Sequence, residues 1–277
     1  LLVNIGGASA IQFQGIDHTN DASINLNEEG ANGNELAELG PNFNLATANL
    51  DLNVQLLRGM RMHLRTFLSS RHHHETYVKG GYLQIDRLDF ISNHFMESIM
   101  DKVTIKVGHM ENNYGDAHFR RSDNAAAIYN PFVGNYILDS YTTEVGSEVY
   151  YQGSGLLVMA GFTNAKLNQD VKSPDKNGIS WLAKVGYDSQ INEDLRLRLT
   201  SSLYTNEKMN RVYLYSGDRT GSRYYSVMES VTATKDDFKS GRFNPGFTQK
   251  LTAIMVNPFV KWKGLEVFGV YELATGG

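Results

Sequence analysis

The chain of 277 residues contains no cysteine and only five prolines. Without cysteine it can form neither a disulfide framework nor a thiolate site. It also has no run of about 20 apolar residues, which excludes a membrane protein built from spanning helices. The net charge of -4 is small, and no block of basic residues suggests nucleic acid as a partner.

The chain does contain a repeated alternation of apolar and polar residues, shown most clearly by two neighbouring segments, 50–56 and 60–65. Their apolar positions are Leu50, Leu52, Val54, Leu56, Met60, Met62 and Leu64, each separated from the next by one position within its segment. Side chains along a strand point alternately to the two faces of a sheet, so each segment has one apolar and one polar face. Gly59 between the segments suits a tight turn.

This pattern recurs along the chain and predicts eleven strands. Long connections at 19–41, 111–142, 164–178 and 206–248 alternate with short ones at 57–59, 152–154, 189–193 and 262–264. Residues 90–100 show helical spacing and predict a short helical turn. Short turns on one side and long loops on the other are typical of outer-membrane barrels. We therefore predict an all-β fold, a transmembrane up-and-down antiparallel β-barrel in the outer membrane of a Gram-negative bacterium; a soluble all-β domain is the alternative.

The expected domain organisation is a single transmembrane barrel over residues 1–277. Bacterial barrels have an even number of strands. Eleven strands and an end reading Ala-Thr-Gly-Gly therefore predict a larger barrel that is incomplete at the C-terminus of this chain. The segment 111–142 is the candidate constriction loop, folded inward from the wall.

The segment 103–110 and the residues after it resemble the phosphate-selective family of outer-membrane porins. Val103-Thr104-Ile105-Lys106-Val107-Gly108-His109-Met110 is similar to that family's strand before a Pro-Phe-Gly turn, although His109 replaces a glutamine and Asn113-Tyr114-Gly115 replaces the turn. Phe119-Arg120-Arg121-Ser122-Asp123 and Asn130-Pro131-Phe132-Val133-Gly134 are similar to the loop that such porins fold into the barrel. The resemblance implies a porin, and its departures leave the solute unspecified.

Two sets of charged residues are candidates for lining or narrowing a pore. Arg61, Arg65, Arg196 and Arg198 are expected on the inner face, where they could form a basic ladder for anions. Pairing with inner acidic residues such as Asp51, Asp86, Glu144, Glu148, Glu266 and Glu272 is the interpretation we favour. Arg120, Arg121 and Asp123 belong to the candidate constriction loop, where the arginines would attract anions.

No catalytic residue, cofactor or metal site is expected from the sequence. His72, His73 and His74 are adjacent, so they would point to opposite faces and rarely converge on one ion. No nucleophile elbow, zinc-binding helix motif or phosphate-binding glycine loop occurs, so the chain is expected not to be an enzyme, although an outer-membrane hydrolase is a possible class.

The predicted function is a porin-like channel for passive diffusion of small hydrophilic solutes or anions. The alternative is a plugged barrel that acts as a scaffold or receptor for a protein partner. Expected partners are outer-membrane lipid and lipopolysaccharide, the small solutes themselves, and a homo-oligomer or larger envelope complex.

Overall fold

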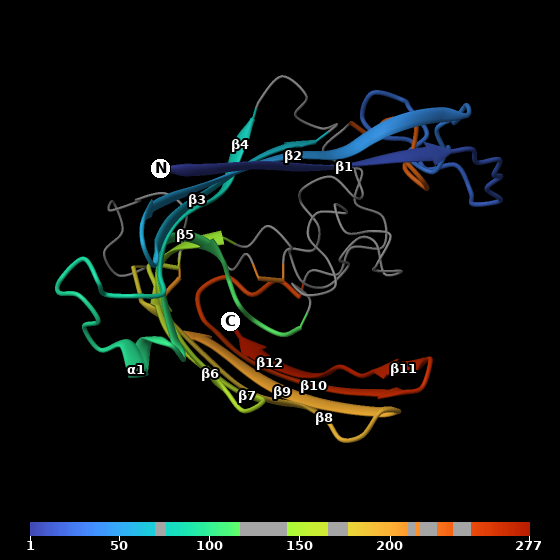
Figure 1. Cartoon of the computed structure of the whole chain (residues 1–277). Coiled ribbons are helices and arrows are strands. Elements are labelled where there is room, and N and C mark those ends of the chain that lie inside the picture. The colour runs from blue at the N-terminus through green and yellow to red at the C-terminus, as the bar shows by residue number, and fades with distance from the viewer. Residues whose placement is uncertain (70–75, 117–142, 166–176, 210–213, 216–225, 235–244) are drawn as a thin grey trace.

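The computed structural model describes residues 1–69, 76–116, 143–165, 177–209, 214–215, 226–234 and 245–277. These residues form one antiparallel sheet and a single helical turn (Figure 1). The strands are β1 (Leu2–Gln14), β2 (Asn42–Leu57), β3 (Met60–Ser69), β4 (Tyr77–Ile85), β5 (Val103–Glu111), β6 (Thr143–Gly153), β7 (Leu156–Thr163), β8 (Ser180–Gln190), β9 (Leu195–Asn206), β10 (Leu251–Trp262), β11 (Leu265–Phe268) and β12 (Tyr271–Gly276). The helical turn is α1 (Glu97–Met100). No helix in these ranges is long and apolar enough to cross a membrane.

Each strand pairs with the next strand along the chain, in the order β1 to β11, and β12 also pairs with β10. The sheet curves strongly, so that β1 and β2 lie opposite β8 to β12 across an interior space (Figure 1). This is the wall of an up-and-down transmembrane β-barrel, and the predicted fold class is confirmed. Among the described strands, the outer edge of β1 does not pair with β11 or β12. A single larger barrel over all 277 residues stays a prediction.

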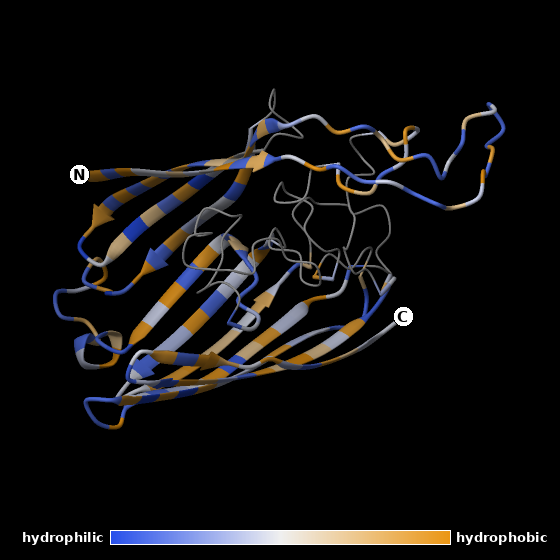
Figure 2. Ribbon diagram, turned by 90° about the vertical axis from the view of Figure 1, so that its right-hand side faces the viewer, coloured by the Kyte–Doolittle hydropathy of each residue, from blue (hydrophilic) through white to orange (hydrophobic). Residues whose placement is uncertain are grey.

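The two faces of the sheet differ in the way that the alternation predicts. On β8, Trp181, Val185 and Tyr187 are exposed on the convex face, while Ser180 and Lys184 are buried on the concave face. Figure 2 shows the same alternation as bands of orange and blue along the strands.

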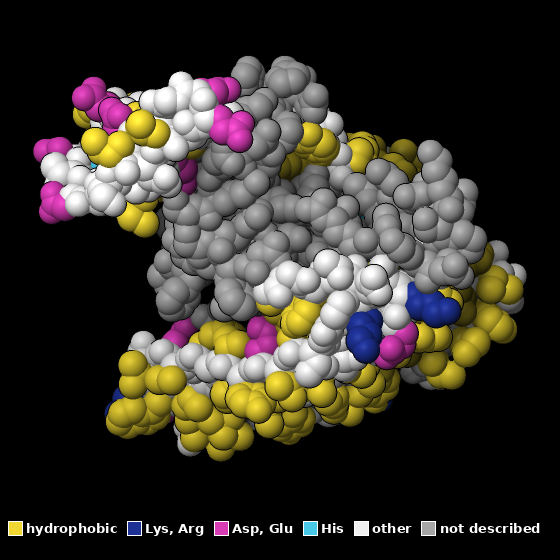
Figure 3. All heavy atoms as spheres, turned by 180° about the vertical axis from the view of Figure 1, so that it is seen from behind, with side chains coloured by type: hydrophobic (Ala, Val, Ile, Leu, Met, Phe, Trp, Pro, Cys, Tyr) yellow, Lys and Arg dark blue, Asp and Glu magenta, His cyan; other side chains and the backbone are white. Residues whose placement is uncertain are grey.

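The convex face is a continuous apolar surface over the lower strands (Figure 3). It includes Leu197, Leu199, Ile254 and Val260, all exposed. Apolar side chains that cover one whole face of a barrel wall require lipid as their solvent. This exterior places the protein in the bacterial outer membrane, as predicted.

The expected eleventh strand, 265–274, is interrupted and forms β11 and β12. Both pair with β10, β11 at 259–262 and β12 at 251–256. The break faces Pro258, which has no amide hydrogen to donate to a neighbouring strand. Gly269 instead donates its amide hydrogen to the carbonyl oxygen of Pro258 at 2.9 Å.

Tight turns join the strands at one end of the wall, which we call the short-turn end. They include Arg58-Gly59, Ser154-Gly155 and Lys263-Gly264. Gly59 has φ +73, and a Cβ added there would lie 2.2 Å from Cβ of Arg87, so only glycine fits. The predicted helical turn in 90–100 is confirmed as α1, which lies in the link 86–102 at this same end.

Candidate functional site in the lumen

The five residues after β5, Asn112–Asp116, cross from their own strand to distant strands of the wall; we call them the inward segment. Lys184 on β8 donates to the side-chain oxygen of Asn113 and, at 2.7 Å, to the carbonyl oxygen of Gly115. Tyr114 donates its hydroxyl hydrogen to Glu272 on β12 at 2.9 Å. β5 pairs only with β4 and β6 in the described sheet, so these contacts span the interior of the barrel.

Asp116 ends the inward segment in a buried ionic contact with β9. Its Oδ2 lies 2.9 Å from Nη2 of Arg198, and its Oδ1 accepts a hydrogen bond of 2.8 Å from Thr200. Its backbone amide donates to the side-chain oxygen of Asn257 on β10 at 3.1 Å. The Asp116 side chain is 0% exposed and that of Arg198 is 16% exposed. Removing the counter-charge of a buried carboxylate is costly, so this pair fixes the end of the segment to the wall.

Gly115 allows the inward segment to lie flat against β10. Its φ is +67, a conformation that L-residues with a side chain rarely adopt. A Cβ at this position would lie 2.4 Å from the sulfur of Met255. The positive φ favours glycine here, and a residue with a side chain would also require the Met255 side chain to shift.

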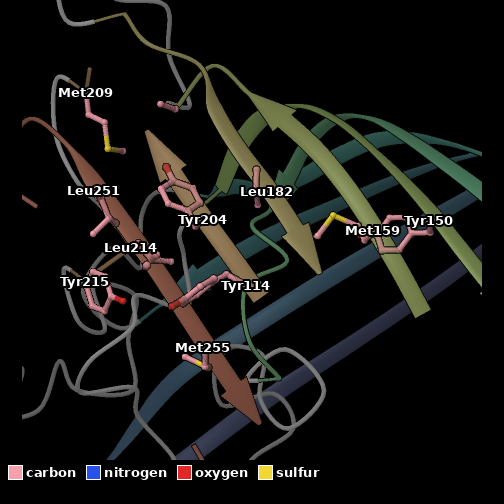
Figure 4. Close-up of a cluster of buried hydrophobic side chains, with 12 residues drawn as sticks. Tyr114, Tyr150, Met159, Leu182, Tyr204, Met209, Leu214, Tyr215, Leu251 and Met255 are labelled. Carbon is pink, nitrogen blue, oxygen red and sulfur yellow. The ribbon is translucent and has the colours of Figure 1, made fainter. Parts of the chain in front are cut away.

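An apolar cluster fills part of the lumen around the inward segment. In Figure 4, Tyr114 lies between the strands that carry Tyr204 and Met255, with Leu182 on the neighbouring strand. Outside the strands, Met209, Leu214 and Tyr215 belong to the same cluster. The hydroxyl groups of Tyr114 and Tyr215 both donate to Oε1 of Glu272, at 2.9 and 2.6 Å. Burial, followed by the nearby Glu272 carboxylate, raises the pKa of Tyr114 far above its usual value.

A second buried carboxylate, Glu144, is satisfied by hydroxyl groups rather than by a cation. It accepts hydrogen bonds from Thr163 and, at 2.8 Å, from Tyr204. Ser180 lies 2.8 Å from the Tyr204 hydroxyl, and Asn206 donates to Ser180 at 3.0 Å. The sequence suggested arginine as a partner for this acid. That expectation fails because the arginines of β9 pair elsewhere.

The four candidate wall arginines lie on the inner face but bind nearby polar groups. Arg65 contacts both carboxylate oxygens of Asp51, at 2.5 and 3.0 Å, and Arg196 does the same with Asp188, at 2.8 and 2.5 Å. Arg61 donates to Gln84 at 2.6 Å. These contacts agree with the favoured interpretation of local pairing over a free basic ladder. Whether the four side chains line a conducting path stays a prediction.

The other candidate residues cannot be placed. Arg120, Arg121, Asp123 and the three histidines 72–74 lie outside the described residues. Within the described part of the chain, no group of three His, Asp or Glu side chains lies close enough together to hold a metal ion.

An open, polar cavity of about 300 Å³ lies on the inner face of β3 to β6. His63, Arg65, Lys79, Lys106 and Glu148 are among its lining residues. The Lys106 ammonium group lies 5.3 and 5.0 Å from the ring centres of Tyr82 and Tyr150, a cation–π arrangement on both sides. The inner face of β3 to β6 thus carries accessible charged groups. A second cavity of about 390 Å³ lies beside Asp188, Arg196 and Thr200 on β8 and β9, whereas the apolar cluster fills the space around Tyr204 and Met255.

Sequence reasoning missed the acidic partners Asp116 and Asp188 and the lumenal tyrosines. Tyr82, Tyr150 and Tyr204 all face the lumen. The sequence does indicate the lumen for Tyr150, because an even number of positions on β6 separates it from Glu144 and Glu148, so the three share one face. Asp116 carried no such signal because it lies in no strand.

Comparison with known proteins finds similarity only at the level of solved structures. No protein-family model and no curated protein matches the chain, so the resemblance to phosphate-selective porins is not confirmed. In-vitro folded OmpT, an outer membrane protein of Vibrio cholerae, is 10% identical with a TM-score of 0.37, covering 98% of this chain and 75% of that one. A loop L8 deletion mutant of the same protein is 9% identical with a TM-score of 0.35, covering 99% and 81%. The trimer form of in-vitro folded OmpT from Vibrio cholerae is 11% identical with a TM-score of 0.31, covering 99% of this chain and 89% of that one.

One expectation from the sequence is corrected by this comparison. The chain was expected not to be an enzyme, but the similar structures are OmpT outer membrane proteins and do not support a restriction to non-enzymatic porins. The lack of a catalytic motif in the sequence was a weak basis for that exclusion, because barrel enzymes can assemble a site from separate strands. The exclusion is therefore withdrawn.

Proposed function

We propose that the protein forms a channel for passive diffusion of small hydrophilic solutes across the outer membrane. The observation that carries the proposal is a polar inner wall whose lumen is narrowed, on one side, by the inward segment 112–116. A barrel of eleven or more strands is too wide for wall side chains alone to fill, so water or a loop must occupy it. Here the polar cavity beside β3 to β6 supplies the space for water.

The anchored inward segment supports a constriction by the loop 111–142. Asp116, the last described residue before 143, lies against β9 on the inner side of the wall. We propose that Arg120, Arg121 and Asp123 border the narrowest part of the channel and that the two arginines favour anions.

A plugged barrel that serves as a scaffold or receptor is the second candidate function. The apolar cluster around Tyr114, Tyr204 and Met255 favours it, since buried side chains fill this part of the lumen. In both candidate functions, the apolar exterior would contact outer-membrane lipid and lipopolysaccharide. Both candidate functions also allow a homo-oligomer or a larger envelope complex.

Liposome swelling separates the two candidates. Purified protein is reconstituted into vesicles that are then placed in iso-osmotic solutions of neutral sugars of increasing size. A diffusion channel gives swelling rates that fall steeply with sugar size, and a plugged barrel gives none. Folding of the inserted protein is checked by its faster migration in unheated detergent gels, so that absence of swelling counts against the channel.

Charge preference is tested with the same protein in a salt gradient across a planar bilayer. Arg120→Ala with Arg121→Ala should move the reversal potential toward cation preference, and raising the salt concentration should reduce the difference as the Debye length shrinks. Arg196→Ala with Asp188→Ala is the matched control, because it removes one charge of each sign from the inner face and leaves the net charge unchanged. An unchanged reversal potential in the double arginine variant would remove the two arginines from the constriction.

A further inference from the structure

The link 86–102 at the short-turn end carries an unusual group of exposed apolar side chains. The other described links at this end are tight turns, whereas this one continues for 17 positions from 86 to 102 and includes α1. Five large apolar side chains in it are between 40% and 60% exposed, and we call them the apolar rim patch: Phe90, Ile91, Phe95, Met96 and Ile99. A loop in water alone has no reason to present so many adjacent apolar groups.

Ionic contacts between polar side chains hold the link in one conformation. Glu97 binds Arg87 at 2.6 Å through one carboxylate oxygen and His94 at 2.7 Å through the other. Arg87 also contacts Asp101 at 3.3 Å. The Arg87 guanidinium, followed by His94, lowers the pKa of Glu97, so this carboxylate is ionised at neutral pH.

The backbone of the link directs the apolar side chains outward. Met96 has φ +53, which is uncommon for a residue with a side chain and is maintained by its surroundings. Its carbonyl oxygen accepts hydrogen bonds from Ile99 at 3.0 Å and Met100 at 2.9 Å. Met100 is buried and attaches the turn to the wall. The patch is therefore a built feature with a fixed orientation.

The link is continuous with the lipid-facing surface of the barrel. Figure 1 shows α1 outside the arc of strands, and Figure 2 shows the link at the end of the wall. Lys102 leads directly into β5, and its carbonyl oxygen accepts a hydrogen bond of 2.8 Å from Gln152. Tyr151, the residue before Gln152, is exposed on the convex face, as are Tyr187 and Trp262 near the other turns of this end. Such aromatic residues mark the boundary between lipid and water in barrels.

We propose that the apolar rim patch inserts into the headgroup region of the leaflet at the short-turn end and anchors the barrel there. Lipid is the occupant that the position selects, because the patch continues the lipid-facing wall past its aromatic boundary. Apolar residues bury in the headgroup and acyl boundary, while the network of Arg87, Glu97 and Asp101 stays in contact with water. The inference is independent of whether the barrel conducts.

The absence of cysteine makes a single-site fluorescence test possible. Ile91→Cys carries an environment-sensitive label, and the protein is folded into vesicles of phosphatidylethanolamine and phosphatidylglycerol without any other protein. We expect a blue-shifted emission and strong quenching when the lipids are brominated near the headgroup. Glu193→Cys, exposed in the β8–β9 turn at the same end, is the matched control and should give the emission of a label in water.

A second variant separates insertion from an effect of the label itself. Phe95→Ser with Ile99→Ser should abolish the blue shift and the quenching at position 91, while faster migration in unheated gels shows that the barrel is still folded. Emission typical of water at position 91, without quenching by brominated lipid, overturns the proposal. So does a blue shift that appears only at high protein-to-lipid ratio, which indicates a second copy as the occupant, or only after a periplasmic extract is added, which indicates a protein.

Discussion

Breaking the contact between Arg198 and Asp116 should release the inward segment from the barrel wall. Arg198→Met keeps an unbranched apolar side chain beside the Phe259 ring but removes the guanidinium, whose carbon lies 5.0 Å from the ring centre. It removes the counter-charge of an aspartate that is 0% exposed. Leaving one partner of a buried ion pair uncompensated costs about 3–5 kcal/mol. The segment can avoid this cost by moving Asp116 to water, at the loss of its contacts with Lys184 and Asn257.

We therefore expect two effects of Arg198→Met in one protein. The free energy of unfolding, measured by urea titration in vesicles, should fall by about 3–5 kcal/mol if the segment stays in place. It should fall by less if the segment detaches and Asp116 reaches water. Single-channel conductance should rise, with increased current noise from a segment that is no longer held. Adding Asp116→Asn should restore much of the stability, because no buried charge then remains without a partner.

Arg196→Met is the matched control for this prediction. Arg196 lies two positions away on the same strand and the same face, and it also pairs with an aspartate. The two side chains of that pair are 43% and 32% exposed, so its loss should change the free energy of unfolding by only about 0–1 kcal/mol. Equal effects of the two substitutions on stability and conductance would refute the anchoring role of Asp116.

Three further outcomes follow from the placement of particular residues. Val185→Arg, on the lipid face between Trp181 and Tyr187, should lower the free energy of unfolding in vesicles by about 2–4 kcal/mol, whereas Leu265→Arg beside a turn should cost about 0–1 kcal/mol; equal costs would contradict the lipid-facing assignment. The pKa of Tyr114 is raised, so its stabilising contact with Glu272 is complete below pH 10, the usual tyrosine value, and is lost only as pH rises toward the folded pKa. A 295 nm titration of wild type against Tyr114→Phe should accordingly show no Tyr114 ionisation near pH 10 in the folded protein. Finally, an impermeant thiol reagent on intact cells should label Glu28→Cys but not Ser154→Cys, and equal labelling would reverse or remove the assigned topology.

The wall of the barrel could be predicted from the sequence because the patterns that specify it lie within each strand and the turn that follows it. Two-residue periodicity, together with turns such as Arg58-Gly59, is enough to assign strands, their faces and their order when each strand pairs with the next. The interruption between β11 and β12 is a partial exception. Pro258 signals that a ladder hydrogen bond is missing, but the signal lies on the neighbouring strand rather than on the strand that breaks.

The contents of the lumen could not be predicted, because they depend on contacts between distant residues. Thr200 and Asp116 are 84 positions apart, and neither lies in a pattern that indicates the other. Alternation shows that Arg198 points inward, but it does not show that a loop residue comes to meet it. From the sequence alone, Arg198→Leu would be expected to be harmless on a hydrated face; the buried carboxylate makes it destabilising.

The central claim is that the barrel conducts through a lumen narrowed by the segment after β5. Single-channel recording of the intact protein, compared with a variant lacking residues 118–134, tests that claim most directly. We expect discrete conductance steps from the intact protein and larger steps from the variant, with both proteins migrating as folded barrels. Equal steps would show that the loop does not narrow the pore, and folded protein without any steps would show that the lumen is closed.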